Sequence, residues 1–575
     1  MGSIRELSVQ TGLHELTVRT CWMRGLESAE AIQDFLNPRI EAMTSPWLIR
    51  DMRIAIDRLG VAWSAQQRVR IYGDYDVDGT TGAALLSWVF RDFGLVFDAR
   101  QPDRFKDGYG LGVGAVEEAA REGVQLLVTV DCGITSFDAA TRARELGIEL
   151  IIVDHHQLDP KRGLPDAHAV LNPQRPDCDS GLRQLCGCGL AFYLAVALRA
   201  YGREQGWFKD RAEPNLKQHL DLVVMATAAD MVPLTGDNHI LVRHGLEVLK
   251  RSKKPGVRAL LAAAGLASKE ISPGHLGFVL GPRINASGRM HSASLALELL
   301  TTEDDSRATE LALELEKLNQ ERADLQNAIW DEVRVRVETG LAEGKFKYGI
   351  VVADAAWHEG VVGIVASRVT ETFRRPAAVI AFREGHGKGS VRSYGGKDVL
   401  NALRASSETL LGFGGHKYAA GLSLKPENLD LFADAFDQAL SGVAEDKDTL
   451  PIYVEGQVAV EDLTVSLLQE LERLGPFGPG NPEPVFVCGA SVHDHRVLKG
   501  RHLKLNLRSS GSVSRSLIEA IWFHAAEDDT LPFTGAAEVT AWAGVPELNR
   551  FRGRITPSFR IKDWKAEIPE SFDRQ

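Results

Sequence analysis

The sequence predicts a multidomain α/β protein with a parallel-sheet domain, a long connecting helix, a smaller α/β domain and a C-terminal β-barrel. Three observations carry this prediction. Apolar runs that end in acidic or histidine residues alternate with helix-like stretches, which is typical of parallel sheets. Residues 301–340 form one charged segment without proline or interior glycine, which favours a long helix. From about residue 449, short strand-like runs separated by turn residues indicate a barrel or sandwich.

Length and composition agree with several soluble domains. The 575 residues exceed what one hydrophobic core holds, and 44% hydrophobic with 25% charged residues is ordinary for globular proteins. We expect no membrane span and no secretory signal, because the sequence has no long apolar run. The six cysteines do not indicate a disulfide scaffold, and the cluster Cys178, Cys186 and Cys188 lacks paired zinc-binding spacing. We therefore expect buried thiols and a cytoplasmic protein.

The most informative segment is IYGDYDVDGT, residues 71–80. A strand-like run, residues 69–72, leads into it, and a helix-like run, residues 82–93, follows. Like charges this close repel each other and need a compensating cation, and oxygen ligands suit Mg²⁺ or Mn²⁺. A polar turn is the alternative, whereas a calcium-binding EF-hand loop is excluded because its twelfth position is Leu85. The candidate ligands in this segment are Asp74, Asp76 and Asp78.

Two further strands end in the same kind of chemistry. VQLLVTVDCGIT, residues 124–135, contains Asp131, and IELIIVDHH, residues 148–156, ends in Asp154, His155 and His156. The helix-like stretch between them suits a right-handed crossover, so both strand ends should meet at one sheet edge. Asp230, in TAADMVPL, follows an apolar segment that could be helix or strand. Carboxylates combined with imidazoles favour two adjacent Mn²⁺ or Mg²⁺ ions over a structural zinc ion.

In this order, DYDVDG, VDCG, VDHH and ADMVPL resemble the motifs of the DHH phosphoesterase superfamily. LGPRINASGRM (280–290), WHEGVVGIVASR (357–368), GSVRS (389–393) and GGHKYAAG (414–421) resemble its companion DHHA1 region. FGPGNPEP (477–484) resembles the start of a further C-terminal domain. Over nearly the whole chain, the motifs are similar to those of RecJ-type single-strand-specific exonucleases.

The resemblance and the patterning together suggest five segments. We expect an N-terminal helical extension (1–45), a DHH catalytic domain (46–300), a connecting helix (301–340), a DHHA1 substrate-binding domain (341–445) and an OB-fold-like nucleic-acid-binding domain (449–567).

The net charge of −12 does not exclude nucleic acid, because basic residues are concentrated in 373–397 and 496–515. In strand His502–Arg508, leucines alternate with polar residues, so Lys504 lies on a predicted basic face suited to single strands. A solvated strand is the alternative for this segment.

The expected reaction is phosphodiester hydrolysis assisted by two metal ions. Asp131 is the candidate bridge between the ions, and His156 either ligates an ion or contacts the scissile phosphate. Asp154 is expected to orient a histidine from behind the ligands. The predicted metal ligands are Asp74, Asp76, Asp78, Asp131, His155 and Asp230. The predicted catalytic residues are Asp131, His155 and His156.

The substrate phosphates need positive charge and backbone amides. We expect His416 in a loop after two glycines, where amides could cradle an anion; a tight turn before a helix is the alternative. The guanidinium fork of arginine suits phosphate, with ion pairing inside the protein as its competing role. The predicted substrate-binding residues are Arg283, Asn285, Arg289, Ser390, Arg392, His416 and Lys504. For base stacking we favour the loop that carries Arg104, Phe105 and Tyr109.

The resemblance implies a metal-dependent 5′-to-3′ exonuclease that releases mononucleotides from single-stranded DNA in DNA repair and recombination. It implies Mn²⁺ or Mg²⁺ as cofactor and suggests a single-strand-binding protein or a helicase as partner. The 5′ polarity comes from the resemblance alone. The alternative is a DHH phosphodiesterase for short oligonucleotides or cyclic dinucleotides, which would not need the C-terminal β domain. An inactive scaffold is disfavoured because every ligand position is occupied, and a pyrophosphatase is disfavoured by the length.

Overall fold

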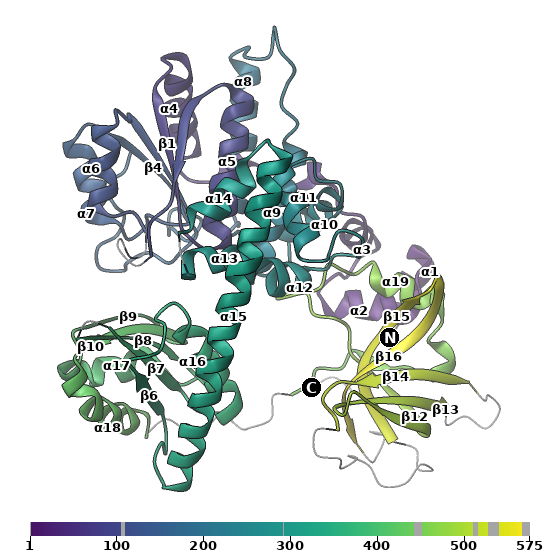
Figure 1. Ribbon diagram of the computed structural model, residues 1–575. Coiled ribbons are helices and arrows are strands. Elements are labelled where there is room, and N and C mark those ends of the chain that lie inside the picture. Colours follow the sequence, from purple (N-terminus) through teal and green to yellow (C-terminus); the bar gives the residue numbers. More distant parts are fainter. Residues whose placement is uncertain are drawn as a thin grey trace.

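The computed structural model describes residues 2–104, 108, 110–290, 292–383, 385–441, 451–509, 516–526 and 540–565. Figure 1 shows two α/β modules, one above the other, joined by a long helix, with a β-barrel to one side. The predicted fold class is confirmed: a parallel-sheet module comes first, a smaller α/β module follows the long helix, and the barrel is C-terminal.

The first module is built on a parallel sheet of strand order β2-β1-β3-β4-β5. The buried apolar strands of this sheet were the ones expected from residues 69–72, 124–135 and 148–156. Because the chain places β2 on one side of β1 and β3 on the other, the order reverses next to β1, where ligands of such sheets collect. The strands are β1 (Arg68–Gly73), β2 (Val96–Arg100), β3 (Leu126–Val130), β4 (Glu149–Val153) and β5 (Ala169–Leu171).

Helices cover both faces of this sheet. Side chains of α4, α5, α8 and α9 share one apolar core with the strands, and those of α6 and α7 form a second core on the other face. The apolar segment before Asp230, left open between helix and strand, is helix α9. The helices are α4 (Met52–Ser64), α5 (Val77–Phe93), α6 (Val113–Arg121), α7 (Phe137–Glu145), α8 (Gly187–Glu204), α9 (Leu220–Ala229), α10 (Asp237–Lys250), α11 (Pro255–Ala263), α12 (Pro273–His275), α13 (Gly281–Met290) and α14 (Ser294–Thr301).

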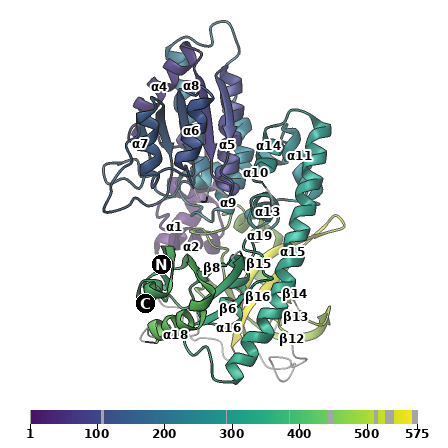
Figure 2. The same cartoon turned by 60° about the vertical axis from the view of Figure 1, so that its left-hand side comes forward.

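Helix α15 (Asp305–Ala342) runs from the first module along the second (Figures 1 and 2). Leu311 and Leu315 are buried in the core of the first module, and Val333 is buried in that of the second. The sequence spacing predicts one continuous apolar face along this helix, made of Leu311, Leu315, Leu318, Leu325 and Ile329. That prediction is wrong, since Leu325 is 37% exposed. The middle of the helix lies outside both cores, so its apolar residues form two separate patches and α15 acts as a spacer.

The second module is a mixed sheet of order β6-β7-β8-β10-β9. The strand-like runs YGIVVA (348–353), AAVIAF (377–382) and LSLK (422–425) predict three strands, and these correspond to β6, β7 and β10. Strands β8 and β9 are not predicted by such runs. The strands are β6 (Ile350–Asp354), β7 (Ala377–Arg383), β8 (His386–Arg392), β9 (Gly412–His416) and β10 (Ala419–Leu424). The helices are α16 (Val362–Phe373), α17 (Val399–Ala405) and α18 (Leu429–Leu440).

The C-terminal strands close into a barrel. Strands β12-β13-β14-β16-β15 are hydrogen-bonded in this order, and an additional pairing of β12 with β15 completes the ring. Leu503, Leu505 and Leu507 of β13 are fully buried, as their alternation with polar residues predicts. The elements are β11 (Gly456–Gln457), α19 (Val465–Glu472), β12 (Phe486–Leu498), β13 (His502–Ser509), β14 (Leu517–Trp522), β15 (Thr540–Phe551) and β16 (Arg554–Lys565).

The N-terminal helices pack against the barrel and share its core, although the two segments lie at opposite ends of the chain. The backbone amide of His14 donates to Glu470 of α19 over 2.8 Å, and Arg24 donates to the Pro482 carbonyl over 2.8 Å. SAEAIQDFL, residues 28–36, has an amphipathic pattern that predicts a helix, and it forms α3, capped by Ser28. These helices are α1 (Gly2–Thr11), α2 (Glu15–Met23) and α3 (Ala29–Leu36).

Short turns complete the described elements. They are the 3₁₀ turns η1 (Ile40–Ala42), η2 (Pro46–Leu48), η3 (Leu216–His219), η5 (Ser407–Thr409), η6 (Pro426–Asn428) and η7 (Val460–Asp462), and the π-helical turn η4 (Leu276–Leu280). The cysteines are buried and unpaired, as expected. Within the described part of the chain, no helix combines the length and apolar character needed to cross a membrane.

Candidate metal centre and adjoining groove

The aspartates of the DYDVD segment lie where β1 meets α5. Asp74 follows the strand and is buried. Asp76 caps α5, its carboxylate accepting a hydrogen bond from the Gly79 amide over 3.1 Å, so α5 begins at Val77, earlier than the predicted 82. Negative charge is stabilised at a helix N-terminus by the unpaired amides and the helix dipole. The helix thereby offsets part of the repulsion between the aspartates.

Asp78 is held from the other side by the start of α8. The backbone amides of Gly187 and Cys188 donate to its carboxylate over 2.6 and 2.7 Å. Gly187 must be glycine, because a Cβ there would lie 2.7 Å from the Cβ of Asp131. Sequence reasoning missed this contribution. The sequence signal for it is CGCG, residues 186–189. Its glycines lie at the start of a helix, and because they have no Cβ, the backbone there can approach carboxylates closely.

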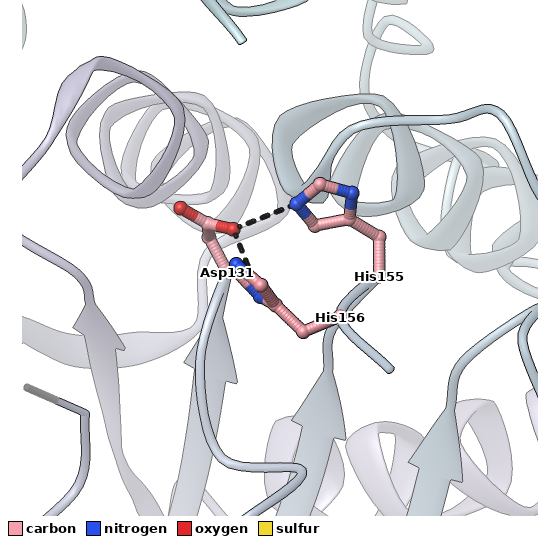
Figure 3. Close-up of side chains that lie close together, drawn as sticks. All are labelled: Asp131, His155 and His156. Carbon is pink, nitrogen blue, oxygen red and sulfur yellow. Dashed lines mark ion pairs between the residues drawn. The ribbon is translucent and has the colours of Figure 1, made fainter. Parts of the chain in front are cut away.

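Asp131 is the central residue of the cluster. It follows β3 with φ +61°, a left-handed conformation that Asp and Asn adopt more readily than most residues. Its Oδ1 lies 3.1 Å from Nε2 of His155 and 3.7 Å from Nδ1 of His156 (Figure 3). Both histidines follow β4, so adjacent parallel strands bring these three side chains together at one sheet edge.

Asp154 supports His156 from behind. Its carboxylate lies 2.8 Å from Nδ1 of His156 and also accepts the amides of His156 and Ile134. Burial lowers the pKa of His156, but the hydrogen bond and charge of Asp154 outweigh it and raise that pKa to about 9. In the metal-free protein His156 is therefore a cation at neutral pH, with its ring fixed in place.

Asp230 approaches from the helical side of the module as the C-cap of α9. Its carboxylate lies 3.7 Å from Nε2 of His155, and Asp78 lies at the same distance from that nitrogen. His155 thus stands between the strand-end carboxylates and Asp230.

The described side chains form three groups whose potential ligand atoms lie within 4.8 Å of one another. Asp131 is shared by two of the groups, and His155 is also shared by two. Asp76 and Asp78 belong to different groups. The groups are Asp131–His155–His156, Asp78–His155–Asp230 and Asp74–Asp76–Asp131.

The electrostatics of these carboxylates fit a bound cation. Burial, followed by the charge of Asp76, raises the pKa of Asp74 to about 8. Burial, followed by the charge of Asp78, raises the pKa of Asp230 to about 8, and burial raises that of Asp131 well above its usual value. One oxygen of Asp74, Oδ1, is buried without a hydrogen-bond partner among the described residues. Buried carboxylates with an unused oxygen and adjoining imidazoles are the donor set that Mn²⁺ and Mg²⁺ accept.

A groove of about 620 Å³ lies between the two α/β modules. Arg104 and Arg289 line it from the first module, and Ser390 and Arg392 of β8 line it from the second. Burial and the neighbouring Arg104 and Arg322 lower the pKa of Arg289 to about 10. Among the described residues, no carboxylate forms an ion pair with the three arginines that line the groove, Arg104, Arg289 and Arg392. Glu359 and Lys388, which sequence reasoning missed, pair with each other at 3.2 Å on the groove wall.

Tyr75 connects the groove with the metal-ligand groups. It lies between Asp74 and Asp76 in the chain, and its ring faces the guanidinium of Arg104 at 5.2 Å. Arg289 donates to the Gly360 carbonyl of the second module over 3.2 Å, so α13 reaches across the groove. The acidic cluster and the basic groove therefore adjoin.

The other predicted substrate-binding residues are placed differently. His416, expected in a loop, is the last residue of strand β9, exposed and outside the groove lining, because GFGGHKYAAG forms the β9–β10 hairpin. Lys504 of β13 is ion-paired with Glu519. Asn285 is half-buried on α13. Phe105 and Tyr109 lie outside the described residues.

Arg283 is engaged within the protein, in the competing role considered for it. Its Nε and Nη2 donate to the Glu316 carboxylate of α15 over 2.5 and 3.0 Å. The pair fastens α13, which flanks the metal loop, to the connecting helix.

We predict that Arg283→Met lowers the free energy of unfolding by about 1–3 kcal/mol, because a charged hydrogen-bond pair is lost. Denaturant unfolding measures the change, and Glu316→Gln should produce a similar loss. Substrate affinity in the folded Arg283→Met protein should stay near that of the wild type. A stable protein with strongly weakened substrate binding would instead assign Arg283 to the substrate.

The fold and the donor groups define the class: a metal-binding α/β protein with two modules that flank an anion-accepting groove. The chain matches the DHH family N-terminal domain over residues 68–227, the DHHA1 domain over 345–442 and the RecJ OB domain over 454–563.

Similar proteins cover most of this chain. The single-stranded-DNA-specific exonuclease RecJ of Escherichia coli is 37% identical over 550 residues, 92% of each chain. That of Bacillus subtilis is 34% identical over 99% of this chain and 70% of its own. The crystal structure of Thermus thermophilus RecJ in complex with Mn²⁺ matches with a TM-score of 0.81 at 29% identity, covering 99% of this chain and 78% of that one. The chain belongs to the RecJ family of single-stranded-DNA-specific exonucleases.

Proposed function

We propose that this chain hydrolyses the phosphodiester bonds of single-stranded DNA, releasing mononucleotides stepwise from the 5′ end, with two Mn²⁺ or Mg²⁺ ions as cofactor. The observation that carries the proposal is the sharing of Asp131 between two donor groups beside a groove lined by arginines. The relatives named as single-stranded-DNA-specific exonucleases and the related structures holding Mn²⁺ or Mg²⁺ support it.

In this proposal the donor groups hold the ions. Asp131 bridges them, and the remaining ligands divide into one set around Asp76 and another around Asp78. When bound, the two ions supply an activated water and stabilise the charge of the leaving oxygen. The proposed ligands are Asp74, Asp76, Asp78, Asp131, His155 and Asp230.

The chain's own residues position the substrate. His156, held by Asp154, presents its Nε2 edge as a proton donor toward a phosphate oxygen. Arg289 and Arg392 offer guanidinium donors to the phosphates from opposite walls of the groove, and Ser390 holds Arg392 through a 2.7 Å hydrogen bond. Because the groove separates the two modules, a flexible single strand can enter it more readily than a stiff duplex.

We extend the proposal to the domain organisation predicted above: 1–45, 46–300, 301–340, 341–445 and 449–567. In it, the barrel lengthens the contact with the strand, with Arg508 beside the paired Lys504 on its polar face. The proposed setting is the cytoplasm in DNA repair and recombination, where a helicase or a single-strand-binding protein presents the strand. A small-substrate phosphodiesterase would have no use for the barrel, so that alternative is not favoured.

Strands labelled at one end test the reaction and its direction. A 5′ label should be released at once as a mononucleotide, whereas a 3′-labelled strand should shorten gradually. Blunt duplex should resist cleavage. Cutting of circular single strands would refute the exonuclease assignment, and the reversed labelling pattern would refute the polarity.

Metal binding should release protons. Asp74 and Asp230 each have a pKa near 8 in the metal-free protein, so protons compete with the cation below that pH. The affinity for Mn²⁺ should therefore rise as the pH increases from 6 toward 8. Calorimetry in two buffers of different ionisation enthalpy measures the release directly, and a pH-independent affinity without proton release would contradict these raised pKa values.

A further inference from the structure

Phe278 is an exposed aromatic residue in the turn that precedes α13, and the reaction as described above does not use it. Its side chain is 75% exposed, although burying a phenylalanine typically contributes about 1.5–3 kcal/mol to folding. It lies in the π-helical turn η4, which leads directly into α13. Single π-helical turns are frequently found at functional sites.

The turn rests on the elements that carry the ligands. A Cβ built at Gly277 would lie 3.1 Å from the Ala228 carbonyl oxygen, at the end of α9 that Asp230 caps. A Cβ at Gly281 would lie 3.7 Å from side-chain atoms of both Ala229 and Val77, and one at Gly288 would lie 3.3 Å from the Tyr75 carbonyl oxygen. Helix α13 therefore runs along the DYDVD segment, with Phe278 before its first turn and Arg289 in its last.

By its spacing along the chain, Phe278 falls on the same side as the groove residue Arg289 of α13. Positions 278, 282, 285 and 289 follow the i, i+4, i+7, i+11 spacing of one helix face. Arg283 on the neighbouring side is turned to α15 through Glu316, whereas Arg289 points to Gly360 of the second module. Figure 1 shows α12 and α13 along the edge of the first module that faces the second module, with α12 on the side of the barrel. Phe278, which lies between α12 and α13, is therefore carried by the backbone that runs along this edge toward the side of the barrel.

The chemistry of this face fits a single strand of nucleic acid. Its groove end offers Arg289 together with Arg104 and Arg392 for phosphates, and its other end offers an exposed ring for a base. Sequence-independent binding of single strands combines a basic groove with aromatic stacking platforms. The eleven residue-to-residue steps from Phe278 to Arg289 span about 16 Å of helix. That length holds at most about five nucleotides at a stacked spacing of about 3.4 Å, and fewer in an extended strand.

We infer that Phe278 is a substrate-contacting residue that stacks on one base of the single strand, a few nucleotides from the scissile phosphate. The inference rests on the proposed function and adds a position-specific contact to it. Stacking on Phe278 anchors the strand on the side of the metal centre that faces the barrel, so strands too short to reach the ring do not use it.

The test combines Phe278→Ala with a scan of abasic sites. Binding is measured by fluorescence anisotropy of 3′-labelled strands with Mn²⁺ in an Asp131→Asn background, in which cleavage should be at least about a hundredfold slower. The value of kcat/KM is measured in the otherwise wild-type enzyme. Phe278→Ala should weaken the binding of strands of eight or more nucleotides about 5- to 100-fold and leave dinucleotides unaffected. In the Asp131→Asn protein that keeps Phe278, an abasic site at one particular position of the strand should weaken binding by a similar factor. The same abasic site should not weaken binding further when Phe278→Ala is also present.

Matched variants separate stacking from damage to the fold. Phe278→Trp should retain tight binding, and Phe278→Leu should resemble Phe278→Ala. Tyr348 is also an exposed aromatic residue, but it precedes β6, whereas Gly360 of the groove side follows that strand. Tyr348→Ala should therefore behave like the wild type. Unchanged affinity in folded Phe278→Ala, or an equal loss at all strand lengths, would overturn the inference and leave this face for a protein partner. A wild-type protein that neither binds nor cuts single strands would instead overturn the proposed function.

Discussion

Excess chelator should abolish the hydrolysis of single-stranded DNA by this protein, and adding Mn²⁺ or Mg²⁺ back should restore it. The buried carboxylates of Asp74, Asp131 and Asp230 have raised pKa values in the metal-free protein, so a cation is needed to keep them all ionised at neutral pH. The readout is release of mononucleotides from a 5′-labelled strand.

Thermal unfolding gives this prediction a second measurement. A ligand that binds only the folded state stabilises it by about 2.7 kcal/mol at a hundredfold excess over its Kd. Mn²⁺ should therefore raise the melting temperature of the first module, and substituting Asp74 and Asp230 by asparagine should remove most of that rise. Full nuclease activity in excess chelator would contradict the two-metal assignment.

Asp131→Asn should reduce kcat by at least about a hundredfold, which corresponds to about 2.7 kcal/mol of lost transition-state stabilisation. Asparagine is a better replacement than alanine, because residue 131 has φ +61° and asparagine tolerates this conformation. The substitution removes one charge from two donor groups at once while keeping the backbone geometry. Single-turnover kinetics at saturating metal measures the change.

A control aspartate separates this effect from a general change of charge. Asp138→Asn alters an exposed aspartate in the first turn of α7, on the same module, and should leave kcat unchanged. Circular dichroism and strand binding should be preserved in Asp131→Asn. A folded Asp131→Asn protein with wild-type turnover would exclude Asp131 as the bridging residue.

The positions of the ligands in the two donor sets follow from the strands and helices that carry them. Asp131 and the histidines come from strand ends, Asp78 is held by amides at the start of α8, and Asp230 is presented by the end of α9. Residues on separate rigid elements hold their positions through the packing of those elements. A substitution in the supporting elements, as at Gly187, should therefore disturb the centre as strongly as the loss of a ligand.

The strand-end carboxylates and histidines could be predicted from the sequence alone. Apolar runs that end in DYDVD, VDCG and VDHH define strands, and the carboxyl ends of parallel strands meet at one edge of a sheet. The order of the modules was predictable for the same kind of reason: periodicity and turn residues are local properties of the chain. The long helix at 301–340 follows from an uninterrupted charged stretch, and it begins at Asp305 with Asp304 as its cap.

Tertiary structure alone decided which residues face one another across long stretches of sequence. Nothing local to Arg283 indicates Glu316 as its partner, and nothing in residues 1–36 indicates that they complete the core of the barrel. The same holds for the amides that bind Asp78 and for the exposure of Phe278 on the face shared with Arg289. Local sequence determines the period and ends of each element, whereas the pairing of faces depends on packing between elements that are distant in the chain.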